Sequence, residues 1–517
     1  MNGAQVLMST ASASGIDVCF TNPGTTELAM IEALDKNKTI RPVLSLFEGV
    51  CSGAADGFGR MLGRPAMTLL HLGPGFANSI ANLHNARRAH SPILNIIGDH
   101  ATWHVEYDPP LASDIASLAR PVSDWFNYAS SPDDCRIKIN EALEVCTTAP
   151  GKISTLVIPT DVQEAKAGTP GKISSNNFQL NSYFNEKKVE QLAKRLSNNN
   201  GEVIILLGTN ALTELGQNAA HKISVTLNAK IYAETFPARW DRGAHISVPE
   251  RFPYFPEVGY DVLKNAKIII LVGARAPIAY FGVTGVPSQL FPENSIYELA
   301  SAAEDGEGAI VSLAEAIGAA SVQTSSDWDP PSQPNLKRPL DVKSCGEMVA
   351  YLLPENSIAV VEGATSTPPF YTASPAGASH TLITNTGGAI GQGMPVATGA
   401  AIACPERQVI NLQADGSGAY TVQALWTQAR EQLNVVTILC SNRKYGILRV
   451  EFERAGIDPT ARITDQMTSL DNPPLNWVAI ANGFGVAACK VNTLEELQTS
   501  LIRAIAEPGP YLIEVPM

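Results

Sequence analysis

The chain has 517 residues, of which 45% are hydrophobic and only 17% are charged, and its formal net charge is −13. The length corresponds to about three domains of roughly 150 residues, and the composition excludes a disordered or fibrous protein. The acidic balance and the absence of any Lys/Arg run exclude the electrostatic signature of a nucleic-acid-binding protein.

The low share of charged residues leaves more apolar surface than a small globule needs, so we expect a buried interface between subunits. No stretch reaches the roughly 18 apolar residues that a membrane helix requires. The eight cysteines form no CxxC pair, which is typical of a reducing compartment rather than of a disulfide framework or a zinc site. The sequence therefore predicts a cytoplasmic protein without a membrane segment.

Short apolar runs alternate with Ala-rich helical stretches over the first part of the chain. These runs have the continuous apolar character of buried parallel strands, and each ends in a Gly- or Pro-containing turn or an acidic residue. They lie at residues 18–24, 66–75, 93–99 and 154–161. A polar stretch rich in Gly, Ser and Asn, from Lys166 to about Asn185, predicts a linker.

The same alternation continues through two further blocks. Their apolar runs lie at residues 203–212, 231–236, 266–277, 357–365, 407–417, 435–446 and 510–517. A second linker is predicted at residues 321–339, which contain four prolines and few aliphatic residues. Repeated strand–helix alternation predicts an α/β protein with three doubly wound parallel-sheet domains, over residues 1–165, 186–325 and 340–517.

The last block carries the strongest chemical signal. Asp415 and Asn442 each follow an apolar strand, and a helical stretch separates the two strands. Residues at the carboxyl ends of neighbouring parallel strands reach the same ligand, so these oxygens and the Lys444 carbonyl predict a Mg²⁺–diphosphate site. Small residues at Gly416 and Ser417 would let backbone N–H groups approach a phosphate. The alternative is an ordinary Asp-Gly turn after a strand.

A glycine-dense loop precedes an Ala-rich helix at residues 386–395. Its glycines, among them Gly388, allow the backbone beside Ile390 to approach a flat or charged ligand, although a flexible helix entry is the simpler alternative. Thr365 and Ser366 follow another apolar strand. Their hydroxyls are either donors to a phosphate or an ordinary helix cap.

The first block offers two proton carriers. Glu48 follows an apolar strand and begins a helix, where a partly desolvated carboxylate is suited to exchanging a proton with a heteroaromatic nitrogen. The alternative is an acidic residue stabilised by the helix dipole. His71 closes another strand and is a candidate proton carrier. The sequence contains no HExxH motif, so we do not expect zinc.

One turn has a partial likeness to a dinucleotide-binding motif. Gly73-Pro74-Gly75 follows a strand, and Asp99 lies about 20 residues further on, as in that motif. However, Asn78 stands at the position of the third glycine, and Pro74 stiffens the turn that would wrap the pyrophosphate. We therefore do not expect NAD.

Taken together, these segments resemble the thiamine-diphosphate-dependent decarboxylase/carboligase family across the whole chain. The resemblance is greatest to benzoylformate decarboxylase and to proteins similar to the acetolactate synthase large subunit. The motifs that carry it are Asn22-Pro23-Gly24-Thr25-Thr26-Glu27-Leu28, Phe47-Glu48-Gly49, Ala55-Asp56-Gly57, Gly73-Pro74-Gly75, Ile158-Pro159-Thr160-Asp161-Val162, Asp415-Gly416-Ser417 and Asn442. The resemblance implies a pyrimidine-binding, a middle and a diphosphate-binding domain, in that order.

The resemblance also implies roles for residues of the first block and of the glycine-dense loop. Glu48 matches the glutamate that protonates the aminopyrimidine ring of the cofactor, and Ile390 matches the bulky residue that holds the cofactor in its bent form. His71 and Thr25 match an active-site histidine and serine of benzoylformate decarboxylase.

In the last block, Asp415, Asn442 and the Lys444 carbonyl match the family's Mg²⁺ ligands, with Gly416 and Ser417 close to the diphosphate. Ala414 stands where the family's GDG motif begins with glycine. In the middle block, residues 275–281 lie where benzoylformate decarboxylase has a second active-site histidine, and none of them is histidine.

The implied function is a thiamine-diphosphate- and Mg²⁺-dependent lyase or transferase that decarboxylates a small 2-oxo acid. It either releases an aldehyde or, like acetolactate synthase, joins the fragment to a second carbonyl. The family's active centre lies between two subunits, with Glu48 from one and Asp415 from the other. A homodimer is therefore the minimum assembly, and a homotetramer is expected. Two alternatives remain open: an acyl-CoA-type lyase of the same family, and a cofactor-binding homologue without catalysis.

Overall fold

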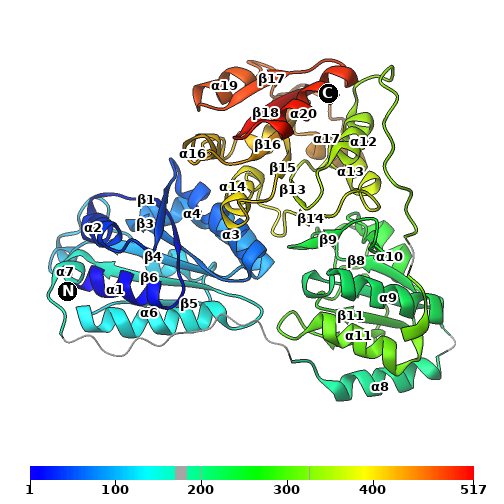
Figure 1. Cartoon of the computed structure of the whole chain (residues 1–517), viewed down its shortest axis with the longest axis horizontal. Coiled ribbons are helices and arrows are strands. Elements are labelled where there is room, and N and C mark those ends of the chain that lie inside the picture. Colours follow the sequence, from blue (N-terminus) through cyan, green and yellow to red (C-terminus); the bar gives the residue numbers. More distant parts are fainter. Residues whose placement is uncertain (169–182, 200, 325) are drawn as a thin grey trace. The chain divides into compact units, whose positions relative to one another are not determined.

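The computed structural model describes residues 1–168, 183–199, 201–324 and 326–517 (Figure 1). The chain forms two compact units. The first comprises Met1–Gln179, Gln333–Phe370 and Asn385–Met517, and the second comprises Leu180–Ser332 and Tyr371–Thr384. Most of the predicted linker between Lys166 and Asn185 lies outside the described residues, and the three domain boundaries remain a prediction.

The N-terminal part of the first unit contains a six-stranded parallel sheet in the order β2-β1-β3-β4-β6-β5. Its central strands are buried apolar runs, as expected for a parallel sheet covered on both faces. The strands are β1 (Val18–Asn22), β2 (Arg41–Leu44), β3 (Ala66–His71), β4 (Ile93–Asp99), β5 (Trp125–Tyr128) and β6 (Ile153–Pro159). The helices are α1 (Gly3–Ala13), η1 (Thr25–Glu27), α2 (Leu28–Lys36), α3 (Glu48–Leu62), α4 (Leu72–Ala89), η2 (Val105–Tyr107), α5 (Ile115–Ala119), α6 (Pro132–Thr147) and α7 (Thr160–Glu164).

The C-terminal part of the same unit contains parallel strands in the order β17-β18-β16-β15-β13. These are β13 (Ser357–Val361), β15 (Val409–Ala414), β16 (Val435–Ser441), β17 (Ala487–Lys490) and β18 (Tyr511–Pro516). The helices are α12 (Val342–Leu352), α13 (Pro368–Ala373), α14 (Gly393–Ala403), α15 (Asp415–Gly418), α16 (Ala424–Arg430), α17 (Gly446–Arg454), α18 (Arg462–Thr468), α19 (Trp477–Gly483) and α20 (Leu494–Ala506).

The two parts of the first unit are joined by the packing of α3 against α14. Two glycines make this contact close: a Cβ on Gly57 would lie 2.2 Å from the Val396 oxygen, and one on Gly399 would lie 1.8 Å from the Ala54 oxygen. No residue with a side chain fits at either position without moving a backbone. Helix α3, which begins at Glu48, is therefore fixed to the part of the chain that carries Asp415.

The second unit contains a five-stranded parallel sheet in the order β10-β8-β7-β11-β12. A short antiparallel pair of strands, β9 and β14, belongs to the same unit. The strands are β7 (Val203–Leu207), β8 (Lys230–Ala233), β9 (Trp240–Arg242), β10 (Glu250–Arg251), β11 (Ile268–Val272), β12 (Ile296–Ala300) and β14 (His380–Ile383). The helices are α8 (Glu186–Ser197), η3 (Thr209–Ala211), α9 (Glu214–Leu227), α10 (Pro256–Leu263), α11 (Gly306–Ala316) and η4 (Ala319–Ser321).

Three parallel sheets with covering helices confirm the predicted fold class. One predicted boundary was wrong: the strand expected over residues 66–75 ends at His71, and Gly73-Pro74-Gly75 lies in the first turn of α4. Pro74 is tolerated there because the first N–H groups of a helix have no intrahelical acceptor. Within the described residues, no helix is both long enough and apolar enough to cross a membrane.

Candidate active site

Asp415 and Asn442 follow neighbouring strands of the C-terminal sheet. β15 and β16 run parallel and pair Ala414 with Cys440, so the residues directly after them leave the sheet at the same edge. Asp415 begins α15 and is 2% exposed, whereas Asn442 is half-buried. Ala414 has an extended backbone (φ −112°, ψ 156°) that needs no glycine.

The carboxylate of Asp415 is held by two backbone donors. The N–H groups of Gly416 and Arg443 donate to Oδ1 and Oδ2 over 2.9 and 2.6 Å. Burial raises the pKa of the Asp415 carboxyl, and these donors oppose the shift. Each oxygen keeps a lone pair that the backbone does not use, and a carboxylate oxygen is the kind of ligand that Mg²⁺ prefers.

The oxygens beside Asp415 are amide and peptide oxygens. Lys444 N–H donates to Asn442 Oδ1 over 3.0 Å, and the Lys444 carbonyl accepts from Gly446 N–H over 2.9 Å. A Cβ on Gly446 would lie 3.1 Å from Asn442 Nδ2 and 3.2 Å from Thr365 Oγ1, so these two side chains converge over this glycine. No group of three His, Cys, Asp or Glu side chains suited to a metal occurs in the described part of the chain. A cation here would therefore depend on mixed oxygen ligands.

The small residues near this edge differ in how they are held. Ser366 is 8% exposed, and its hydroxyl makes no hydrogen bond of ordinary geometry within the described residues, although it lies beside the Cys440 thiol, a weak partner. Ser417 Oγ donates to Ala414 O over 3.3 Å. A Cβ on Gly416 would lie 2.7 Å from the Tyr445 ring, so a larger residue here would force this ring to move. The Ser366 hydroxyl is thus available as a donor to an anion.

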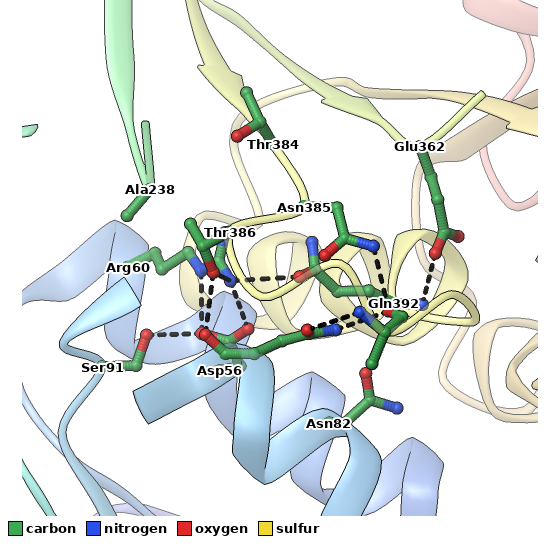
Figure 2. A network of polar contacts seen from close by, with 12 residues as sticks. Asp56, Arg60, Asn82, Ser91, Ala238, Glu362, Thr384, Asn385, Thr386 and Gln392 are labelled. Atoms are coloured by element: carbon green, nitrogen blue, oxygen red, sulfur yellow. Dashed lines mark hydrogen bonds and ion pairs between the residues drawn. The ribbon is translucent and has the colours of Figure 1, made fainter. Parts of the chain in front are cut away.

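The glycine-dense loop that carries Ile390 is held on its C-terminal side by Glu362. This buried carboxylate accepts hydrogen bonds of 2.7–2.8 Å from the N–H groups of residues 391–393. Figure 2 shows Glu362 directed at Gln392 of this segment. Burial raises the pKa of Glu362, and these donors oppose the shift. On the other side, Gly388 has φ 78° and its N–H donates to Asn385 Oδ1. Between the two fixed segments, the Ile390 side chain remains 37% exposed.

A buried ion pair on α3 contacts the same loop (Figure 2). Arg60 Nη2 lies 2.6 Å from Asp56 Oδ2, with the two side chains 1% and 0% exposed. The same Nη2 donates to Thr386 Oγ1 and to Gln392 Oε1 over 3.3 Å each, and Ser91 Oγ donates to Asp56. The loop is therefore tied to α3 as well as to the C-terminal sheet.

Glu48 is the first residue of α3 and is 7% exposed. Asn78 Nδ2 donates to its Oε2 over 2.9 Å. A Cβ on Gly75 would lie 3.0 Å from Glu48 Oε1 and 3.4 Å from the His71 Cβ, so the carboxylate and the histidine flank this glycine. The structure thus brings the two predicted proton carriers of the first block together.

His71 closes β3 and bonds to a buried carboxylate. Its Nδ1 lies 2.8 Å from Glu27 Oε2 and 3.1 Å from Thr26 Oγ1. Glu27 is 0% exposed, and burial raises the pKa of its carboxyl against the hydrogen bonds from Thr26, Gly24 and His71. Nε2 is the ring nitrogen left for a substrate. Thr25, the other residue that the resemblance places in the active site, has an exposed side chain.

Sequence reasoning missed four residues of this region: Glu27, Thr26, Asn78 and Glu362. Glu27 and Thr26 belong to the motif at residues 22–28, but no role was predicted for them. The sequence does not show which side chains of this turn point inward. Asn78 was considered only as a departure from a dinucleotide motif. Glu362 directly follows an apolar strand, and this position was the signal that could have identified it.

A separate carboxyl group lies at the edge of the sheet in the second unit. Glu234 directly follows β8, and burial raises its pKa to about 7, opposed by hydrogen bonds from Thr209 and by the charge of Arg275. Arg275 follows β11, and Thr209 follows β7. The residues that follow three neighbouring strands thus place a carboxyl, a guanidinium and a hydroxyl group together at one edge of this sheet.

Comparison with protein families gives two matches to thiamine pyrophosphate enzymes. The N-terminal TPP binding domain matches residues 1–118, and the C-terminal TPP binding domain matches residues 368–515. The matched segments carry Glu48 and His71 in the first case and Asp415 and Asn442 in the second.

Similar proteins align over nearly the whole chain. A Mycobacterium tuberculosis protein provisionally named acetolactate synthase large subunit IlvX is 39% identical over 100% of this chain and 99% of its own. Benzoylformate decarboxylase of Pseudomonas aeruginosa is 29% identical over 97% of this chain and 96% of its own. The solved structure of a thiamine diphosphate-dependent 4-hydroxybenzoylformate decarboxylase from Rhodococcus jostii covers 100% of this chain and 99% of its own with a TM-score of 0.85 at 23% identity, which shows the same fold. The chain therefore belongs to the thiamine pyrophosphate enzyme family and is a thiamine-diphosphate-dependent enzyme related to acetolactate synthases and benzoylformate decarboxylases.

Proposed function

We propose that this enzyme decarboxylates a small 2-oxo acid and either releases the aldehyde or joins the fragment to a second carbonyl. The names of its relatives support this reaction class, since acetolactate synthases and benzoylformate decarboxylases occur among them. The observation that carries the proposal is the pairing of Glu48 with a neutral donor, Asn78, beside His71. A buried carboxylate next to a histidine can move protons at two points of one reaction.

The C-terminal edge would hold the charged end of the cofactor. Asp415, Asn442 and the Lys444 carbonyl supply oxygen ligands for Mg²⁺, and the paired backbone donors on Asp415 keep its carboxylate in a fixed orientation. The hydroxyl of Ser366, which has only the weakly bonding Cys440 thiol beside it, and the half-buried hydroxyl of Thr365 are suited to the diphosphate. The small residues at 416 and 417 let the backbone approach the same group.

The remaining residues would act on the organic part of the cofactor. The rigid loop at Gly388 presents Ile390 as an apolar support for the cofactor, and Glu48 exchanges a proton with a ring nitrogen through its carboxylate. When bound, thiamine diphosphate supplies the electron sink that makes loss of CO₂ from a 2-oxo acid possible. His71 Nε2 would carry protons to and from the substrate, with Nδ1 held by Glu27. The exposed Thr25 hydroxyl would face the substrate.

The proposed subunit assembly rests on the family resemblance, which places the residues matching Glu48 and Asp415 on different subunits. We propose that each centre takes Glu48 from one subunit and Asp415 from another, so that a homodimer is the minimum and a homotetramer the working assembly. Large exposed apolar side chains such as Leu28 (65% exposed) and Met467 (69% exposed) support a buried interface. None of the eight cysteines, all of which lie in the described residues, forms a disulfide, which favours the cytoplasm. Light scattering at several protein concentrations measures the assembly, and an active monomer would contradict it.

The test is CO₂ release from a panel of 2-oxo acids, comprising pyruvate, 2-oxobutyrate, and branched-chain and aryl members, with thiamine diphosphate and Mg²⁺ present. Glu48→Gln keeps the shape of the side chain and removes the charge. Glu144→Gln, at an exposed position of α6, is the matched control. We expect release by the wild type and the control and a loss of about 100-fold or more in Glu48→Gln.

The acid that is turned over fastest identifies the substrate class, and product analysis separates aldehyde release from carboligation. If the wild type released CO₂ from none of these 2-oxo acids, the decarboxylase assignment would be refuted. An acyl-CoA-type lyase or a homologue without catalysis would then be the next assignments to test.

A further inference from the structure

Helix α4 carries a row of three asparagines on one face. Asn78, Asn82 and Asn85 are spaced four and three residues apart, so their side chains lie one helical turn from each other. Asn78 is exposed, whereas Asn82 is 4% exposed and Asn85 is 0% exposed. Burying an amide costs free energy unless its hydrogen bonds are replaced, so a row of this kind calls for a structural reason.

Each asparagine contacts a different part of the candidate site. Asn78 Nδ2 donates to Glu48 Oε2 over 2.9 Å. Asn82 Nδ2 donates to the carbonyl of Gly49, next to Glu48, over 2.9 Å, and lies 3.5 Å from the carbonyl of Gly391, next to Ile390. The row therefore begins at the carboxylate and reaches the glycine-dense loop within two helical turns.

Asn85 forms the firmest contact with this loop. Its Nδ2 donates to the Ala389 carbonyl over 2.7 Å, and its Oδ1 accepts from the Ala389 N–H over 3.1 Å. A single side-chain amide thus pairs with both polar groups of one residue, as a neighbouring strand would. A Cβ on Gly387 would lie 2.4 Å from Asn85 Oδ1, so the loop approaches the helix more closely than any side chain at that position would allow.

These contacts complete the fixing of Ile390. Asn85 holds the residue before it, Asn82 contacts the residue after it, and Glu362 holds residues 391–393 from the opposite side. Thr421 Oγ1 also donates to the Gly391 carbonyl over 2.8 Å. The backbone on both sides of Ile390 is thereby held while its side chain stays partly exposed.

The residue type matters as much as the spacing. A carboxamide offers two donors and an acceptor in one plane and brings no charge into a buried site. A lysine or arginine at position 78 would place a cation against Glu48, and an apolar residue at position 85 would leave the Ala389 peptide group without partners. Ordinary helix packing would use apolar side chains here and would not direct amides at Glu48 and the loop.

We propose that the row Asn78–Asn82–Asn85 makes α4 a positioning element that fixes Glu48 and Ile390, two of the groups that one chain would contribute to the chemistry. Asn82 and Asn85 are positioning residues for Ile390, and Asn78 is one for Glu48. The inference rests on the proposed function, in which Glu48 and Ile390 face the cofactor. With centres shared between subunits, these two groups serve neighbouring centres, so α4 links them.

The test compares Asn85→Asp with Arg88→Gln, an exposed position on the same helix. The aspartate keeps the shape of the side chain but sets a carboxylate oxygen against the Ala389 carbonyl, where both groups only accept. Asn82→Ala is a second variant in case Asn85→Asp does not fold. The readouts are amide hydrogen exchange of residues 385–393 in the cofactor-free chain, the affinity for thiamine diphosphate by calorimetry, and kcat and KM for the preferred 2-oxo acid.

In both asparagine variants we expect exchange in the loop to be about tenfold faster, cofactor affinity and kcat to fall about tenfold, and KM to stay near the wild-type value. Arg88→Gln should match the wild type in every readout. Unchanged exchange in both variants, or faster exchange with unchanged affinity and kcat, would overturn the inference. Failure of the wild type to bind cofactor or turn over substrate would refute the proposed function instead, and the exchange data, recorded without cofactor, would still decide whether the row holds the loop.

Discussion

Replacement of Glu27 by glutamine isolates the charge that faces His71. Gly24 N–H donates to Glu27 Oε2 over 2.7 Å, and His71 Nδ1 lies 2.8 Å from the same oxygen. Thr26 Oγ1 donates to Oε1 over 2.7 Å, and a hydroxyl can turn to accept from an amide instead. Glutamine can therefore keep every hydrogen bond, and only the negative charge beside the imidazole is lost.

The size of the effect follows from that single change. A hydrogen bond to a charged group contributes about 1.5–3 kcal/mol and one between neutral groups about 0.5–1.5 kcal/mol, so the contact with His71 loses about 1–1.5 kcal/mol. The bond that orients the His71 ring is then weaker, although its geometry is kept. Because about 1.4 kcal/mol corresponds to a factor of ten in rate, kcat should fall about 5- to 10-fold in Glu27→Gln, with little change in KM.

A measurement of thermal stability distinguishes the loss of the Glu27 charge from misfolding of the variant. Burial raises the pKa of Glu27 above its ordinary 4.5, so the folded state binds the proton more tightly than the unfolded state does, and the wild type loses stability as the pH rises from about that value through the raised pKa. Glutamine removes this loss, and Glu27→Gln should be at least as stable as the wild type at pH 8 by thermal unfolding. Glu32→Gln, an exposed position on α2, is the control. An unchanged kcat in Glu27→Gln would refute the reasoning.

Three further predictions concern stability and cofactor binding. Arg60→Met should cost about 3–5 kcal/mol in urea unfolding, because it leaves the buried Asp56 carboxylate without its cation; a cost below 1 kcal/mol would contradict this. Asp415→Asn should weaken Mg²⁺-dependent binding of thiamine diphosphate roughly 10- to 100-fold in calorimetry, and unchanged affinity would remove Asp415 from the metal site. Burial raises the pKa of Glu234 from 4.5 to about 7, so the wild type should lose stability, by at most about 3 kcal/mol, as the pH rises across that range. Glu234→Gln should not show this loss. Parallel curves of stability against pH for the two proteins would refute the prediction.

The strands of the sheets could be predicted because parallel sheets are covered on both faces. The run at residues 93–99 is apolar apart from Asn95 up to its final Gly-Asp, and β4 occupies this range. The short edge strands β2, β5 and β17 were not predicted, because their half-exposed residues lack that continuous pattern. The turn at Gly73-Pro74-Gly75 was misassigned because glycine and proline are as common in a first helical turn as in a loop.

In the candidate site, positions directly after strands were predictable and contacts across the chain were not. Asp415 and Asn442 were found because the carboxyl ends of parallel strands meet at one edge. Glu27 was missed because only the folded turn shows that Thr26 and Glu27, rather than Thr25, point towards His71. The ties between α4 and the loop of Ile390 join segments about 300 residues apart, and no local pattern reports such a contact.

The central claim is that Glu48 exchanges a proton with the bound cofactor. The most direct measurement is exchange of the proton on C2 of the thiazolium ring of bound thiamine diphosphate with deuterium, followed by quenched-flow NMR without substrate. The wild type should accelerate this exchange over free cofactor, and Glu48→Gln should lose about 100-fold or more of the acceleration while still binding cofactor and Mg²⁺. Equal exchange rates in the two proteins, with the cofactor bound in both, would contradict the account.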